Sequence, residues 1–307
     1  MNLLKLLCGL LISISICFTE SDVKTNTNIE TYNVLSFSGG GSFGAVEIGI
    51  LSKLIDDKLI STKYDLYTGI SAGGLNAGFL SHFDTIESGL IPIQHIYSNL
   101  SNREIYKLKP LTGLSLLNTE PLKNTITSIL SGLKSISSKY RPTIIGTTNL
   151  NTGYLDTYYY NQLELNDQIQ LLMCTSAIPL VFPPITFKSQ LYVDGGEIQN
   201  QLLDPITGLT DKFINITYIT PYDTIQSNYN ITTFEDIIKR NIQVVRNSFN
   251  NELYRLNQNC NIKRGIIYMY YVDPITLTDY SMLDFDKGND LLKIGYNNIK
   301  HKIFNLC

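Results

Sequence analysis

The chain has 307 residues, a formal net charge of −3 and 43% hydrophobic residues. This composition is ordinary for a globular protein, and the length allows a single α/β domain with a sizeable core. Because no basic block is present, the charge excludes nucleic-acid binding through a basic surface.

The N-terminal segment has the pattern of a secretory signal. Lys5 precedes an apolar run of 13 residues over 6–18, and polar residues follow from Thr19. Crossing a bilayer needs about 20 residues, so the run is short for a membrane span. We expect a signal peptide over 1–19, a polar spacer over 20–31 and a secreted protein. The alternatives for this segment are an uncleaved anchor or a buried helix. The alternative location of the protein is peripheral contact with a membrane.

The rest of the chain, 32–307, is expected to form one domain in which strands and helices alternate. Strands are predicted at 32–37, 63–67, 143–149, 154–159, 191–193, 213–220 and 265–272. Helices are predicted from Ala45, then at 75–80, over much of 81–140, and at 168–174, 233–256 and 288–304. Pro92 and Pro121 are expected at helix starts. The alternation favours a three-layer α/β/α sandwich around a mainly parallel sheet.

A tight turn between a strand and a helix carries the first candidate catalytic residue. Gly69-x-Ser71-x-Gly73 has the spacing of a nucleophile elbow, in which glycines on both sides allow a very sharp turn. The backbone N–H groups after Ser71 open a helix and carry its positive dipole end. A single motif of this kind also occurs as an ordinary glycine-rich turn.

Four glycines follow the strand at 32–37, and this pattern has two functional interpretations. Gly39, Gly40, Gly41 and Gly44 could expose backbone N–H groups as an oxyanion hole. A dinucleotide fingerprint would need an acidic residue about 20 residues further on, at a strand end. Asp56-Asp57 lies nearer and at a helix end, so we prefer the oxyanion hole.

Ser71 needs a base, because a serine hydroxyl is a weak nucleophile at neutral pH. Only three histidines exist, His82, His95 and His301, and each sits in a context typical of a structural residue. Asp194 closes a strand and precedes two glycines, so its carboxylate lies on a tight turn at a sheet end. A carboxylate bonded directly to a serine can accept its proton.

Together these motifs resemble the patatin-like phospholipase family. The resemblance covers residues 34–207 strongly and the extension 208–307 weakly. It rests on four motifs that follow one another in the family's order along the chain: Ser38–Gly44, Tyr64–Gly74, Thr175–Pro179, and Asp194-Gly195-Gly196 with Asn200. A weaker similarity extends to Ile294-Gly295-Tyr296 in the last predicted helix.

The resemblance implies a Ser–Asp hydrolase of lipid acyl esters that uses no histidine, cofactor or metal. Ser71 would be the nucleophile, Asp194 the proton acceptor, and N–H groups near Gly40 and Gly41 would hold the oxyanion. An acyl-serine intermediate and transient contact with a lipid surface would follow. The family usually has Arg or Lys where Phe43 stands, which puts phospholipid preference in doubt more than the chemistry.

Two other functions stay open on the same residues. The chain could be a serine esterase or thioesterase for another acyl class, or a lipid-binding protein without activity. A binding protein needs neither Ser71 nor Asp194. The apolar stretch around residues 178–182 could pack the core or line an acyl site.

Overall fold

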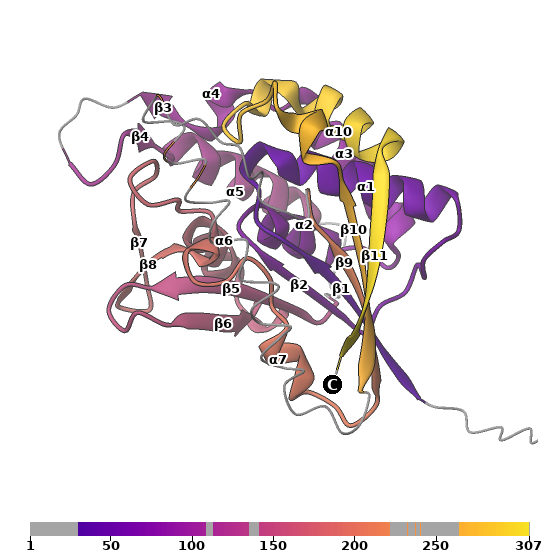
Figure 1. The fold of residues 1–307 in the computed structure, drawn as a ribbon. Coiled ribbons are helices and arrows are strands. Elements are labelled where there is room, and N and C mark those ends of the chain that lie inside the picture. The colour runs from indigo at the N-terminus through magenta and orange to yellow at the C-terminus, as the bar shows by residue number, and fades with distance from the viewer. Residues whose placement is uncertain are drawn as a thin grey trace, which may run out of the picture.

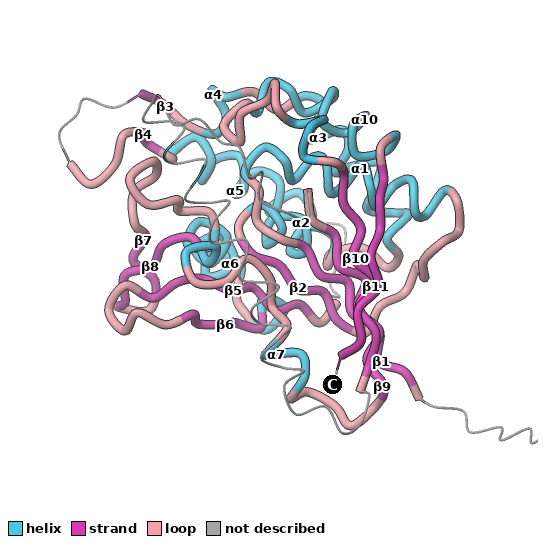
Figure 2. Tube along the Cα trace, in the orientation of Figure 1, coloured by secondary structure: helices cyan, strands magenta, loops and turns pink. Residues whose placement is uncertain are grey.

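The computed structural model describes residues 30–108, 113–134, 141–221 and 264–306, together with Thr232, Ile237 and Arg240. It shows a twisted mixed sheet with helices packed against it (Figure 1 and Figure 2). The expected signal peptide, nearly all of the spacer and the helix expected at 233–256 lie outside these residues, the last apart from Ile237 and Arg240. Over the described ranges, none of the helices has both the length and the apolar character of a membrane span.

The main sheet has nine strands in the order β11-β10-β9-β1-β2-β5-β8-β7, with β6 also paired to β5. Its strands are β1 (Thr31–Phe37), β2 (Leu66–Ile70), β5 (Thr143–Asn149), β6 (Leu155–Tyr159), β7 (Ile185–Phe187), β8 (Gln190–Asp194), β9 (Phe213–Ile219), β10 (Gly265–Val272) and β11 (Ile299–Leu306). From β10 through β9, β1 and β2 to β5, neighbours run parallel. The pairings of β11, β6, β8 and β7 are antiparallel, including the predicted β5–β6 hairpin.

Alternating side chains of the strands divide the core between the two faces of the sheet. Leu35 and Tyr67 pack with the helices of one face, whereas Val34, Leu66 and Ile70 pack with the other cluster. Successive residues of a strand point to opposite faces, so each strand contributes to both clusters. The α/β fold with a mainly parallel central sheet is therefore confirmed.

The described helices are divided unequally between these faces. The larger group contains α1 (Gly44–Asp56), α2 (Ala72–Leu80), α3 (Ile86–Asn99), α4 (Asn102–Ile105), α5 (Glu120–Lys134), α6 (Leu165–Thr175) and α10 (Gly288–Asn297). The opposite face carries α7 (Asp204–Thr207) and the residues just before it. A separate two-stranded sheet pairs β3 (Lys107–Leu108) with β4 (Leu117–Asn118). No sequence pattern predicted this small sheet.

Helices α1 and α10 lie very close together because each presents a glycine to the other. A Cβ on Gly49 would stand 2.1 Å from the Leu292 carbonyl oxygen, and one on Gly295 would stand 2.1 Å from that of Val46. Neither distance is compatible with a side chain. The C-terminal helix thereby fixes the helix that follows the glycine loop.

The C-terminal prediction of one helix over 288–304 was wrong. Helix α10 ends at Asn297, and Asn298 donates from its side chain to the Ile294 carbonyl at 3.1 Å. The chain then pairs with β10 as strand β11, so His301 lies in a strand. Asparagine at a helix end satisfies a free carbonyl and favours termination there.

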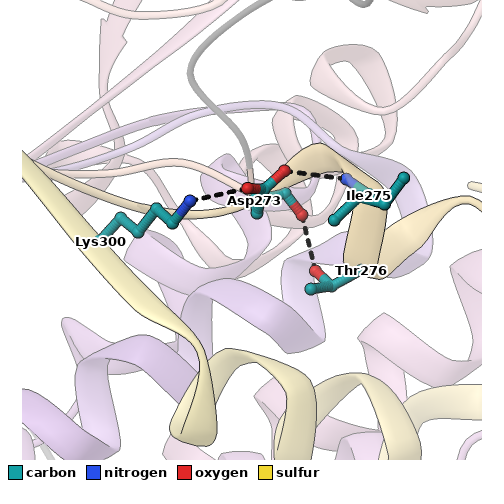
Figure 3. A network of polar contacts seen from close by, with 4 residues as sticks. All are labelled: Asp273, Ile275, Thr276 and Lys300. Atoms are coloured by element: carbon teal, nitrogen blue, oxygen red, sulfur yellow. Dashed lines mark hydrogen bonds and ion pairs between the residues drawn. The ribbon is translucent and has the colours of Figure 1, made fainter.

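Strand β11 is also tied to the turn after β10 through Asp273 (Figure 3). The carboxylate of Asp273 accepts from Lys300 Nζ at 2.6 Å and from the Ile275 N–H at 3.2 Å, and its carbonyl accepts from the Thr276 hydroxyl. The hydrogen bond from Lys300 lowers the pKa of Asp273. This network joins two chain segments that the sequence separates by the whole of α10.

The two prolines behave differently. Pro121 is the second residue of α5, close to the predicted start, whereas Pro92 lies inside α3. A proline inside a helix removes a hydrogen bond, so the pattern favoured a start there. Buried Ile86, Leu90 and Ile93 lie on both sides of Pro92, and their packing holds α3 together across it.

Candidate active site

Ser71 stands at the junction between β2 and α2 in a strained backbone conformation. Its φ is +55°, a value that residues other than glycine rarely adopt. A Cβ on Gly69 would lie 2.2 Å from the Gly73 carbonyl oxygen, and one on Gly73 would lie 2.3 Å from that of Ser38. Both glycines are therefore required by the close approach of backbone around the turn, as the sequence predicted.

Asp194 meets Ser71 across the sheet although 123 residues separate them. Strand β8 pairs with β5 so that Asp194 lies opposite Thr147, and this places its side chain beside the end of β2. Ser71 Oγ donates to Asp194 Oδ2 at 2.6 Å, and the Gly196 N–H donates to the other carboxylate oxygen at 2.8 Å. The two side chains are buried, so water screens this contact weakly.

Thr175 fixes the backbone of the serine turn. The Ser71 N–H donates to Thr175 Oγ1 at 2.9 Å, and the same hydroxyl donates to the Gly146 carbonyl at 2.6 Å. The motif after α6 has a second contact with the site, because the Asp194 N–H donates to the Ala177 carbonyl at 2.9 Å. This segment therefore holds both Ser71 and Asp194.

The four glycines of the loop after β1 differ in whether their N–H groups are engaged. The Gly39 N–H donates to Asn200 Oδ1 at 3.1 Å, and the Gly44 N–H points back to the Gly41 carbonyl in a helical turn. The expected oxyanion donors Gly39 and Gly44 are thus already occupied. Within the described ranges, the N–H groups of Gly40 and Gly41 have no hydrogen-bond partner.

Gly40, Gly41, Ser71 and Asp194 line one small cavity of about 20 Å³. Gly41 has φ +58°, and a Cβ there would lie 2.3 Å from the Met282 carbonyl oxygen. The loop thus needs glycine both for its conformation and for its approach to the segment before α10. The cavity brings the serine, the carboxylate and two unengaged N–H groups together.

A buried carboxylate that sequence analysis missed joins the glycine loop to the serine helix. Glu47 on α1 is fully buried, and its Oε1 accepts from the N–H and the hydroxyl of Ser38, each at 3.0 Å. Its Oε2 accepts from Asn76 Nδ2 on α2 at 3.0 Å. Tyr97 on α3 donates to Asn76 Oδ1 at 2.7 Å. An acidic residue on the apolar face of α1 was the available signal.

Burial keeps Tyr97 a donor in this network. Desolvation, followed by the nearby Glu47 carboxylate, raises the pKa of the Tyr97 phenol far above its ordinary value. The phenol therefore stays protonated and continues to donate to Asn76. Ser38, at the start of the glycine loop, and Asn76, on the helix after Ser71, are consequently held to one another through Glu47.

On its other side, Ser71 adjoins an apolar cavity of about 110 Å³. Its walls come from α2, α3 and α5 and from the segments around α6 and α10, and they are almost wholly aliphatic and aromatic. The lining includes Leu75, Phe79, Ile93, Ile126, Leu130 and Leu172. Of the stretch at 178–182, Ile178 and Phe182 line the cavity, Val181 is buried and Leu180 is exposed.

All three histidines lie in described ranges, and each has a contact with a residue other than Ser71. His82 Nε2 contacts the Tyr160 hydroxyl at 3.2 Å, and burial lowers the pKa of His82 to about 4. His95 contacts Asn99 on the surface of α3, and the ring of His301 lies beside that of Tyr270. In the part of the chain that the structure describes, no group of three or more side chains is placed to hold a metal ion.

Phe43 and the acidic pair at 56–57 also find structural places. Phe43 is buried in the core with α1 and α3, so the position where the family has a basic residue carries a packed aromatic ring here. Asp57 pairs with Lys53 on the surface of α1 at 2.8 Å, and Asp56 accepts from the Tyr296 hydroxyl. These contacts differ from those expected of the acidic residue that binds the ribose in a dinucleotide site.

The patatin-like phospholipase family model matches residues 35–207, more than half of the chain. The chain belongs to this family. An uncharacterized protein of Acanthamoeba polyphaga mimivirus is 24% identical, with 89% of this chain and 94% of that protein covered. A cGAMP-activated phospholipase of Pseudomonas aeruginosa is 26% identical over 57% of this chain and 55% of its own length. A cGAMP-activated phospholipase of Escherichia coli is 26% identical over 54% of this chain and 52% of its own length.

Solved structures give weaker likenesses. VipD of Legionella pneumophila matches with TM-score 0.39 and 14% identity, covering 89% of this chain and 68% of VipD. A chain of the ExoU–SpcU complex of Pseudomonas aeruginosa matches with TM-score 0.31 and 14% identity, covering 89% and 53%. The chain spans about half the length of the bacterial phospholipases it resembles in sequence. Family membership and the two bacterial phospholipases that are similar in sequence support a lipid hydrolase.

Proposed function

We propose that this patatin-like protein hydrolyses lipid acyl esters with Ser71 as nucleophile and Asp194 as its base. The observation that carries the proposal is the 2.6 Å hydrogen bond between Ser71 Oγ and Asp194 Oδ2 inside a buried site. A lipid-binding protein would need neither group, and it would have no use for a strained serine turn.

The reaction begins when Ser71 Oγ attacks the ester carbonyl carbon and its proton moves to Asp194 Oδ2. The carbonyl oxygen becomes negative and accepts from the N–H groups of Gly40 and Gly41. Collapse of this tetrahedral species expels the alcohol, which takes the proton from Asp194. The acyl group stays on Ser71 as an ester.

Water then attacks the acyl carbon and gives a proton to Asp194. The second tetrahedral species uses the same two N–H groups, and its collapse frees the fatty acid while the proton returns to Ser71. Throughout, the Gly196 N–H holds the carboxylate through its other oxygen, so Asp194 keeps its orientation toward Ser71.

The two cavities suggest how an ester lies in the site. The acyl chain occupies the apolar cavity, whose walls exclude water and gain about 0.8 kcal/mol for each buried methylene. The alcohol part lies toward the small cavity at the glycine loop.

We assign the extension 208–307 to the same domain as the active site. The N-terminal signal pattern supports secretion of this enzyme.

Labelling with a fluorophosphonate tests the serine assignment. The purified protein should be labelled at Ser71, and Ser71→Ala should abolish both labelling and release of fatty acids from a mixed lipid extract. An unlabelled native protein would favour a lipid-binding role. Hydrolysis of acyl-CoA without hydrolysis of glycerolipids would favour a thioesterase instead.

A further inference from the structure

Three leucines with exposed side chains lie on chain segments that line the apolar cavity nearby or pair with such a segment. Leu108, Leu114 and Leu180 are 88%, 74% and 63% exposed. Leu108 belongs to β3, Leu114 lies shortly before β4, and Leu180 lies in the segment between α6 and β7. These three residues are called the leucine rim below.

Backbone pairing brings the three segments of the leucine rim together. Ser115 bridges Leu180 in a parallel arrangement, and the Leu116 N–H donates to the Leu180 carbonyl at 2.9 Å. Leu117 pairs with Leu108 in the small β3–β4 sheet. The three leucines therefore lie on neighbouring backbone segments, although Leu108 and Leu180 are far apart in the sequence.

The same segments form part of the cavity wall. Ile178 and Phe182, on either side of Leu180, line the cavity that begins at Ser71. Ile105 lines it as well, three residues before Leu108. Leu108 and Leu180 are thus carried by segments that border the place where an acyl chain would lie, and the segment of Leu114 pairs with that of Leu180.

Leu180 also has a costly backbone conformation. Its φ is +68°, which disfavours any residue other than glycine or asparagine. Folding gains little from a leucine that is held in this conformation while most of its side chain faces water. Strain of this kind gathers at functional segments, where the surrounding structure holds the residue in place.

Resting on the proposed function, we propose that the leucine rim is the face by which the protein docks on a lipid surface. An acyl chain that crossed water on its way to Ser71 would lose about fourfold in its equilibrium for each methylene. Leucines that enter the outer layer of a lipid surface remove that water from the path. A lipid surface also solvates the three exposed side chains themselves.

Vesicle sedimentation tests this with the full-length protein and vesicles of phosphatidylcholine. Leu180→Asn keeps the backbone preference for a positive φ, and Leu108→Ser and Leu114→Ser remove the other two side chains. Each single change should weaken vesicle binding about tenfold, and the triple change should abolish sedimentation. Leu59→Asn is the matched control, because Leu59 is 62% exposed and precedes β2 at the end away from Ser71.

Hydrolysis of a soluble short-chain ester, p-nitrophenyl butyrate, separates docking from chemistry. The triple variant should keep this activity while it loses hydrolysis of vesicle lipid. A native protein that binds vesicles but never hydrolyses either substrate would overturn the proposed function and leave docking supported.

Two results would overturn the docking proposal. One is a triple variant that still sediments with vesicles as the native protein does. The other is a triple variant whose oligomeric state in light scattering differs from that of the native protein while its vesicle binding is unchanged. The leucine rim would then join copies of this chain.

Discussion

On one side of Ser71 lies a small polar cavity, and on the other lies a larger apolar one. The polar side is made by backbone at the ends of β1, β2 and β8 and by buried hydrogen bonds that backbone N–H groups donate to Asn200 and Glu47. The apolar side is made by side chains of separate helices. On the polar side, a substitution that changes a single atom should therefore alter activity. On the apolar side, the change in side-chain volume should decide the effect.

The largest effect is expected for Asp194→Asn on the polar side. An amide keeps the shape of the carboxylate but cannot take the serine proton, so kcat should fall about 10²- to 10⁴-fold. Ester hydrolysis at saturating substrate measures this loss, and thermal unfolding checks that the fold is kept. A variant with native kcat would show that another group acts as the base.

A smaller loss is expected for Glu47→Gln, which never touches substrate. The amide nitrogen replaces one acceptor oxygen, so Ser38 or Asn76 loses its partner and the glycine loop shifts relative to Ser71. A misplacement of about 1 Å costs about 100-fold in kcat with little change in KM. Glu87→Gln is the matched control, because Glu87 is an exposed glutamate in the first turn of α3. Equal kcat in both variants would remove Glu47 from the positioning of the loop.

On the apolar side, Ile126→Phe should alter chain-length preference and leave the chemistry intact. The larger ring fills part of the cavity beside α5 and displaces about two methylenes of a long acyl chain, a loss of about tenfold in kcat/KM. Short-chain esters should be hydrolysed as before. Measurement of kcat/KM on butyrate and palmitate esters tests this prediction. Equal losses of kcat/KM on both esters would mean that the acyl chain lies outside this cavity.

The smallest effect on hydrolysis is expected at His82, which lies outside both cavities. Because burial lowers its pKa to about 4, the folded protein keeps His82 neutral at a pH where the unfolded chain binds a proton. The free energy of unfolding should therefore fall as pH decreases from about 6.5 to 4, by roughly 3 kcal/mol in total. Urea unfolding of native protein and His82→Gln at pH 7 and pH 4.5 measures it. A variant with the same pH dependence would contradict this.

The polar side could largely be predicted from the sequence because its pieces are short and local. A sharp turn needs glycines next to it, so Gly69 and Gly73 mark Ser71 in one short stretch. Asp194 could be predicted for a similar reason, since a strand end followed by two glycines is also a local pattern. The residues made Asp194 a candidate base for Ser71, the family resemblance implied the same pair, and the structure places the two side chains in contact.

The parts that could not be predicted depend on contacts between distant segments. Glu47 looks like one polar residue on an apolar helix until Ser38 and Asn76 are placed around it. The apolar cavity arises only when several helices pack together. The engaged N–H of Gly39 required Asn200 to be placed, 161 residues further on. The C-terminal strand was missed because its residues pair with β10, which no local pattern reveals.

Strand β11 has a consequence for how the molecule behaves at high concentration. It is the last strand at its end of the described sheet, and it carries Lys300 and Lys302 on exposed positions. Unpaired strand edges invite pairing with a second molecule, and lysines along such an edge make that association unfavourable. We therefore expect Lys300 and Lys302 to oppose edge-to-edge association when molecules of this protein are crowded together.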